Sequence, residues 1–207
     1  MKILFFTDVH SGDMGKTYVP SRKILLKKFD KILEKSKECD VMVCCGDISI
    51  FGDGLKNIFE ILKKSGKKLF IIHGNHEMEG ELKPLCDGNK IVFLHKRHLK
   101  FGDVTFAGYG GGGFCDRDEM LDNWCAKLKN NVSGKLVFFS HAPPFNTKLD
   151  NLPHLGHRGS MSVREAIEIL KPNIFASGHF HDTFLKRDKI NNTLLVNPGD
   201  EGIILEI

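Results

Sequence analysis

The stretch KILFFTDVH, residues 2–10, joins an uninterrupted apolar run to an aspartate and a histidine. Residues 3–6 show no polar alternation, which is typical of a strand buried on both faces of a sheet. Asp8 and His10 come directly after this strand, and ligands of open α/β sheets usually bind at the carboxyl ends of the strands. The stretch therefore predicts a buried strand that delivers two polar side chains to a functional edge.

The chain that follows alternates helical and strand patterns. A helical period runs from about Ser21 to Cys39, with an apolar face formed by Leu25, Phe29, Ile32 and Leu33. A buried run at 41–45, a second helical pattern at 55–64 and a third apolar run at 69–72 come next. This β-α-β-α-β order predicts an α/β fold whose first strands are parallel.

The second half is predicted to contain shorter strands and two helices. A helix is expected over residues 116–129, with an apolar stripe of Met120, Trp124 and Leu128. Another helix should begin at Ser162, because Ser162 and Glu165 form the sequence pattern of a capping box. The strand candidates are residues 91–94, 99–101, 104–107, 136–139, 174–176, 193–196 and 203–207. We see no linker or repeat, so one domain over residues 1–207 is expected.

Residues that can bind metal ions follow the ends of five predicted strands. They are Asp8, His10, Asp47, Asn75, His141, His179 and His181. Carboxylate, imidazole and amide oxygen ligands suit manganese, iron or zinc, and not copper(I) or an iron–sulfur cluster. Seven ligands are too many for one ion but suit two ions that share a carboxylate. Two ions about 3.5–4 Å apart form the clamp used for in-line displacement at phosphorus.

The spacing of these residues also fits a metal site. Asp8 and His10 are two residues apart, as are His179 and His181, and residues at this spacing point to the same side of an extended backbone. Gly46, Gly74 and Gly178 come before candidate ligands, where the chain must turn sharply and approach a metal without a clashing Cβ.

The ordered motifs D-x-H (8–10), G-D (46–47), G-N-H-E (74–77), His141 and G-H-x-H (178–181) resemble the calcineurin-like metallophosphoesterase superfamily. The later segments resemble its small single-domain prokaryotic members. The resemblance implies a four-layer αββα sandwich, with two mixed sheets flanked by helices.

The resemblance also implies a role for each residue. One ion would be held by Asp8, His10, Asp47 and His181, and the other by Asp47, Asn75, His141 and His179. A metal-bridging hydroxide would attack phosphorus in line. His76 would stabilise the transition state or protonate the leaving oxygen, and Glu77 would orient His76. Manganese is the expected ion, with iron, zinc and nickel as alternatives.

Three further segments carry less specific signals. His157 and Arg158 lie in a basic loop that either binds the substrate or is simply exposed, and we treat them as candidate substrate-binding residues. The glycine run at 110–113 predicts a closely packed or flexible turn, and Tyr109 and Phe114, which flank it, could stack on a substrate base. Residues 197–199 resemble another family segment, but Asp200 stands where a serine is frequent in the family.

The predicted function is hydrolysis of a small or cyclic phosphodiester. A phosphomonoesterase, a non-catalytic metal-binding interaction scaffold and a nuclease are the alternatives. A scaffold typically lacks ligands or the histidine at position 76, which are present here, and a net charge of +4 is too small to argue for a polymeric nucleic acid substrate.

Composition is that of an ordinary globular protein, with 41% hydrophobic and 27% charged residues. The apolar run at the start is too short for a signal peptide, and no stretch approaches the ~20 apolar residues of a membrane helix. None of the six cysteines forms a C-x-x-C pair. We expect a cytoplasmic protein with reduced thiols, no membrane partner and a small phosphate-ester substrate, and the sequence leaves a homo-oligomer open.

Overall fold

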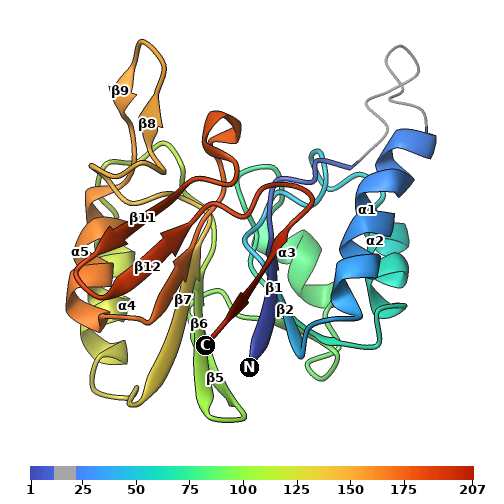
Figure 1. Ribbon diagram of the computed structural model, residues 1–207, viewed down its shortest axis with the longest axis horizontal. Coiled ribbons are helices and arrows are strands. Elements are labelled where there is room, and N and C mark those ends of the chain that lie inside the picture. The colour runs from blue at the N-terminus through green and yellow to red at the C-terminus, as the bar shows by residue number, and fades with distance from the viewer. Residues whose placement is uncertain (12–21) are drawn as a thin grey trace.

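Two β-sheets pack face to face between two layers of helices (Figure 1). The computed structural model describes residues 1–11 and 22–207. The predicted start of the first helix at Ser21 lies outside the described residues, and the side chain of Leu25 is not described either.

The first sheet has the strand order β13-β1-β2-β3-β4. Strands β1 to β4 are parallel, and β13 joins β1 in the antiparallel direction. The strands are β1 (Lys2–Phe6), β2 (Val41–Cys44), β3 (Lys68–Ile71), β4 (Ile91–Phe93) and β13 (Ile203–Glu206). Its outer face carries the helices α1 (Arg22–Ser36), α2 (Leu55–Lys63) and α3 (Glu79–Leu82), followed by the short helix η2 (Lys83–Leu85).

The second sheet has the order β11-β12-β10-β7-β6-β5, with antiparallel strands at its two edges and parallel strands between them. The strands are β5 (Arg97–Phe101), β6 (Val104–Tyr109), β7 (Lys135–Ser140), β10 (Ile174–Ala176), β11 (Arg187–Ile190) and β12 (Thr193–Val196). Its outer face carries α4 (Glu119–Leu128) and α5 (Met161–Leu170).

A continuous apolar core fills the space between the sheets. Phe5 and Phe70 from the first sheet and Phe106 and Phe139 from the second are fully buried there, and the Phe70 and Phe106 rings lie 4.6 Å apart. Both faces of each central strand are covered, which explains the apolar runs without alternation. The expected α/β architecture of two mixed sheets flanked by helices is confirmed.

The predicted apolar stripe of α4 is partly wrong. The side chains that this helix buries are Leu121, Cys125 and Leu128, whereas Met120 is 62% exposed. The helix begins after Asp118, whose carboxylate accepts hydrogen bonds from the backbone N–H groups of Met120 and Leu121. Leu128 belongs to the buried face as predicted, and Trp124 is partly buried beside it, so only the N-terminal part of the stripe was misplaced.

The predicted start of α5 is also wrong. Ser160 is the N-cap, and its hydroxyl accepts a hydrogen bond from the Val163 amide at 3.3 Å. Ser162 is buried, and its hydroxyl instead accepts a hydrogen bond from the Asp118 amide at 2.9 Å. By sequence, either Ser160 or Ser162 could be the N-cap. The Ser162 hydroxyl is occupied by the Asp118 amide, at the N-cap of α4, which leaves Ser160 as the N-cap of α5.

The structure contains elements that were not predicted. They are the short helices α3 and η2, strand β11 at an edge of the second sheet, and a hairpin within residues 143–160, formed by β8 (Asn151–Leu152) and β9 (Gly156–His157). The hairpin projects from one end of the sandwich (Figure 1). Among the described helices, none is long and apolar enough to cross a membrane.

Candidate metal centre

The carboxyl ends of strands from both sheets meet at one end of the sandwich. Segments after β1, β2 and β3 bring Asp8, Asp47 and Asn75 from the first sheet. Segments after β7 and β10 bring His141 and His179 from the second sheet. Interactions across the two sheets join these residues, so the predicted ligands lie together in space.

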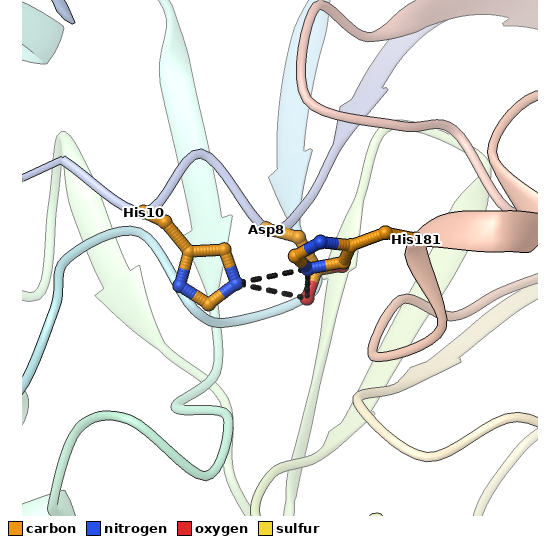
Figure 2. Close-up of side chains that lie close together, drawn as sticks. All are labelled: Asp8, His10 and His181. Atoms are coloured by element: carbon orange, nitrogen blue, oxygen red, sulfur yellow. Dashed lines mark hydrogen bonds and ion pairs between the residues drawn. The ribbon is translucent and has the colours of Figure 1, made fainter. Parts of the chain in front are cut away.

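Asp8, His10 and His181 form the first group of potential ligands (Figure 2). The Nε2 atoms of the two histidines lie 3.0 Å apart. Asp8 Oδ1 lies 3.7 Å from His10 Nε2 and 3.6 Å from His181 Nε2. Three donor atoms at these separations can surround one cation, so this group fits a metal ion.

Asn75, His141 and His179 form the second group. The amide oxygen of Asn75 lies 2.9 Å from His141 Nε2 and 3.0 Å from His179 Nδ1. The other ring nitrogen of His141, Nδ1, lies 3.0 Å from the carbonyl oxygen of Cys45, which fixes the ring with Nε2 toward the site. An oxygen and two imidazole nitrogens again converge on one point.

Asp47 lies between the two groups. Its Oδ2 atom is 3.8 Å from His10 Nε2 and 3.3 Å from His141 Nε2. The carboxylate therefore reaches a histidine of each group, as a ligand shared by two ions would have to do.

The backbone of the site differs from the extended form that the sequence predicts. Asp8, His10, Asp47 and His179 all have left-handed φ angles, of 51°, 46°, 52° and 71°, and His181 begins the short helix η3 (His181–Thr183). The predicted extended backbone at the two ligand pairs is therefore wrong, although both pairs reach the site. Non-glycine residues in this region are strained and cluster at functional sites.

The glycines that precede ligands make room for carboxylates. A Cβ on Gly74 would lie 2.0 Å from Asp47 Oδ1, and a Cβ on Gly178 would lie 2.2 Å from Asp8 Oδ2. The absence of a side chain at these two positions allows Asp47 and Asp8 to be buried where they are.

The protonation states of Asp8 and His179 suit metal binding. Burial raises the pKa of Asp8, but contacts with His10 and His181 outweigh burial and hold that pKa well below its usual range. Burial lowers the pKa of His179 to about 4, and the nearby charge of His141 adds to this effect. At neutral pH the carboxylate is therefore charged and the imidazole neutral, as metal ligands must be.

His141 should make the stability of the metal-free protein depend on pH. Burial lowers its pKa, but the carboxylates of Asp47 and Asp8 outweigh burial and raise it from 6.5 to about 9. The charged form stabilises the fold by about 3 kcal/mol; this contribution is complete below pH 6.5 and is lost as the pH rises through 9. We expect the destabilisation caused by His141→Asn, measured by urea unfolding without metal, to shrink between pH 6 and pH 10. A constant difference would contradict the assignment.

His76 lies beside the first group. Its backbone N–H donates to Asp47 Oδ1 at 2.9 Å, and its ring centre lies 4.7 Å from that of His10 at an interplanar angle of 80°. The Nδ1 atom is buried and has no hydrogen-bond partner among the described residues. The ring nitrogens of His10 and His76 and a carboxylate oxygen of Asp47 also lie within 4.8 Å of one another.

The structure corrects the predicted role of Glu77. Its buried carboxylate accepts hydrogen bonds from the backbone N–H groups of Asp47, Ser49 and Gly74, at 3.1, 2.7 and 3.2 Å. Among the described residues, none of its hydrogen bonds reaches the His76 ring. Glu77 therefore acts on the backbone, and it ties the segment after β2 to the segment after β3.

Loss of the Glu77 carboxylate should destabilise the protein strongly. Glu77→Ala leaves three buried N–H groups without an acceptor, so we expect the free energy of unfolding to fall by about 3 kcal/mol or more. Glu77→Gln retains one oxygen acceptor and should cost less. Glu79→Ala is the control, because that carboxylate pairs with Lys83 at the surface and its loss should cost at most about 0.5 kcal/mol. Equal effects of Glu77→Ala and Glu79→Ala would contradict this role.

His157 and Arg158, the candidate substrate-binding residues, lie outside the lining of the cleft at the ligands. The ligands open into a cleft that the loop 143–160 borders through Leu152, and neither of the two basic residues lines it. His157 Nδ1 instead lies 2.8 Å from the buried carboxylate of Asp150, which also accepts hydrogen bonds from the loop backbone. These contacts give His157 a role in shaping the loop.

The glycine run at 110–113 is a closely packed turn, which was one of the two predicted possibilities. A Cβ on Gly110 would lie 2.5 Å from His73 Nδ1, and a Cβ on Gly113 would lie 2.6 Å from His179 Cε1. Phe114 comes next and lines the cleft, whereas Tyr109 is buried and donates to Asp118 at 2.8 Å. Phe51 also lines the cleft, and nothing in the sequence singled it out.

Fold and site define an α/β sandwich with candidate metal ligands at the junction of its two sheets. The chain belongs to the calcineurin-like phosphoesterase family, whose model matches residues 1–183. This family uses divalent metal ions, and the groups described above are the candidate ligands for them in this chain.

Individual proteins resemble this chain in sequence or in fold. An uncharacterised protein of Methanocaldococcus jannaschii is 30% identical over 222 residues, which cover 98% of this chain and 89% of the relative. A protein of Thermus thermophilus superposes with a TM-score of 0.74 at 14% identity, over 97% of this chain and 89% of that one. A dimetal phosphatase of Danio rerio gives a TM-score of 0.64 at 14% identity, over 94% and 86% of the two chains. At such identities the structural likeness concerns the fold.

Proposed function

We propose that this protein hydrolyses small phosphodiesters with two divalent metal ions, and that manganese is the working ion. The observation that carries the proposal is the position of Asp47 between two groups of ligands, Asp8, His10 and His181 on one side and Asn75, His141 and His179 on the other. The donors are oxygen and imidazole nitrogen, which manganese accepts readily.

The burial and charge of the carboxylates also fit such ions. Asp8 and Asp47 are each 2% exposed, and charges buried to this degree are normally paired with an opposite charge or bound to a metal. When bound, two ions supply a nucleophile from water at neutral pH and neutralise charge that develops on the phosphoryl oxygens. In this proposal Asp8 and Asp47 supply the negative charge that keeps both ions in the cleft.

His76 is the proposed general acid. Its ring adjoins the first ligand group through His10 and also borders the cleft, so it can reach an oxygen of an ester bound there. Glu77 fixes the backbone on which His76 and Asp47 are carried. The proton would pass from the imidazole to the leaving oxygen as the P–O bond breaks.

The charges around the cleft favour a diester over a monoester. Among the described residues that line it, Lys28 is the single lysine or arginine, and its ammonium lies 2.5 Å from the carboxylate of Asp200. A monoester carries close to two negative charges at pH 7 and a diester carries one. A cleft whose lysine is already paired is better matched to the smaller charge.

The deciding experiment compares two esters. We expect the metal-loaded protein to hydrolyse bis(4-nitrophenyl) phosphate faster than 4-nitrophenyl phosphate, with both activities lost in a chelator and restored by Mn²⁺. Activity that persists in the chelator would contradict the two-metal proposal. A metal-loaded protein that cleaves neither ester would favour the scaffold, and preference for the monoester would favour a phosphomonoesterase.

A further inference from the structure

Two large aromatic side chains lie exposed at the cleft. Phe51 is 71% exposed and Phe114 is 82% exposed, and both line the same cleft as the ligands. Phenylalanine usually contributes to stability by being buried, and an exposed ring in a concave site is typical of ligand binding. Packing in the hydrophobic core therefore does not explain why phenylalanine stands at these two positions.

The backbone at Phe51 makes this point stronger. Phe51 has a φ of 49°, in the left-handed region where a bulky residue is strained and glycine or asparagine is favoured. Its neighbour Gly52 also has a positive φ, of 77°. Because the ring remains mostly exposed, burial does not offset the strain, so folding stability does not explain a phenylalanine here. Its ring centre lies 4.8 Å from that of His76.

Phe114 is held at the other ligand group. Gly113 has a φ of 109°, and its missing Cβ allows the backbone to pass against the His179 ring. The Phe114 ring centre consequently lies 4.8 Å from that of His179, at an interplanar angle of 84°. The turn at 110–113 thus brings an exposed aromatic ring directly beside a candidate ligand.

The two phenylalanines adjoin different parts of the site. Phe51 contacts His76, which packs against His10 of the first group, and Phe114 contacts His179 of the second group. A phosphodiester has two organic substituents on one phosphorus. A phosphate bound at the ligands would have one aromatic surface on the side of each group. The cleft volume of about 680 Å³ is enough for a small diester of this kind.

We propose that Phe51 and Phe114 are the two binding surfaces for planar aromatic ester groups, such as nucleobases, of a small phosphodiester substrate. This inference rests on the proposed function of the same cleft and narrows its substrate class. Stacking on an aromatic side chain accepts any base, because every base has a π-face, so the surfaces select for an aromatic ring and not for one base.

The first test measures binding. Adenosine 5′-monophosphate and ribose 5-phosphate share a sugar and a phosphate and differ by the base. Calorimetric titration of the metal-loaded protein should give about tenfold tighter binding of the nucleotide, and this preference should disappear in the double variant Phe51→Leu, Phe114→Leu. An unchanged preference in the double variant would overturn the proposal.

The second test uses two diesters with the same leaving group, bis(4-nitrophenyl) phosphate and methyl 4-nitrophenyl phosphate. The wild-type protein should have an about tenfold lower KM for the diaryl ester at similar kcat, and the KM ratio should approach one in the double variant. Absence of any turnover would contradict the proposed function while the titrations still decide the aromatic surfaces. Loss of kcat with an unchanged KM ratio would mean that the rings merely position the histidines.

Two variants separate binding from folding. Phe51→Gly relieves the left-handed strain, so it should leave the midpoint of thermal unfolding unchanged or raise it, and still weaken the preference for adenosine 5′-monophosphate. A lower midpoint with the preference intact would overturn a binding role for Phe51. Met120→Ala is the control, because Met120 is exposed on α4 outside the cleft and its loss should change neither quantity.

Discussion

Replacement of Asp47 by asparagine is expected to release both metal ions and to reduce phosphodiester turnover by at least about 10³-fold. Asp47 Oδ2 lies between His10 and His141, at 3.8 and 3.3 Å, so its charge serves both ligand groups. Asparagine keeps the size of the side chain and removes that charge. Elemental analysis of the purified variant gives the number of bound ions, and bis(4-nitrophenyl) phosphate gives the rate.

Asp8→Asn is the matched comparison for this prediction. Asp8 contacts His10 and His181 of the first group, so this variant should lose one ion and keep the other. Asp103→Asn serves as the control, because that carboxylate pairs with Lys135 at the surface. If Asp47→Asn and Asp8→Asn each lost a single ion, Asp47 would not be shared, and the two-ion interpretation of the site would fail.

The sequence predicts the layers of this fold well because its central strands are buried on both faces. Runs such as residues 3–6 and 69–72 lack polar alternation, and in short segments that pattern is typical of strands covered on both sides.

Elements that bury fewer apolar side chains were missed. Strand β11 lies at a sheet edge, with exposed residues such as Arg187 and Lys189, so it carries little apolar signal. The start of the α4 stripe was misplaced because Met120 and Leu121 are neighbours and either could start an apolar stripe.

The site was predictable to the extent that strand ends converge. Because parallel strands of both sheets end on one side, the ligand types at those ends predicted a cluster without knowledge of any contact. The sequence did not predict the backbone conformation of the ligands or the hydrogen bonds that hold their loops in place. Asp8 and Asp47 have left-handed backbone, which aspartate tolerates better than most residues. Most aspartates adopt other conformations, so the residue type alone does not predict this one. The bonds of Glu77 to three backbone amides depend on how two loops meet.

The sequence also gave little indication of which residues line the cleft around the ligands and could set substrate specificity. Phe51 follows a strand by several residues in a glycine-containing loop, where a phenylalanine gives no periodic signal. Lys28 and Asp200 are far apart in the sequence and form an ion pair that leaves the cleft without a free lysine or arginine among its described residues. In the proposed function, sequence motifs therefore identify the residues around the phosphate, while the proposed contacts to the organic part of the substrate come from residues that the fold brings together.

His76→Ala should lower turnover by roughly 10²–10⁴-fold on a diester with an alkyl leaving group, while both ions remain bound. A general acid matters most when the leaving oxygen is strongly basic. The loss should therefore be much smaller for bis(4-nitrophenyl) phosphate, whose leaving group departs without a proton. Rates for a series of leaving groups, with metal content measured on the same samples, separate this role from a structural one.

The competing role for His76 is that of a ligand, since its ring, His10 and Asp47 could also hold an ion. In that case His76→Ala would lose metal, and the rate would fall equally for every leaving group. His98→Ala, on the exposed face of β5, should change neither rate nor metal content. Retained metal together with a leaving-group-dependent loss would assign the proton transfer to His76, because an imidazole outside the metal ligands has no other way to sense the basicity of the departing oxygen.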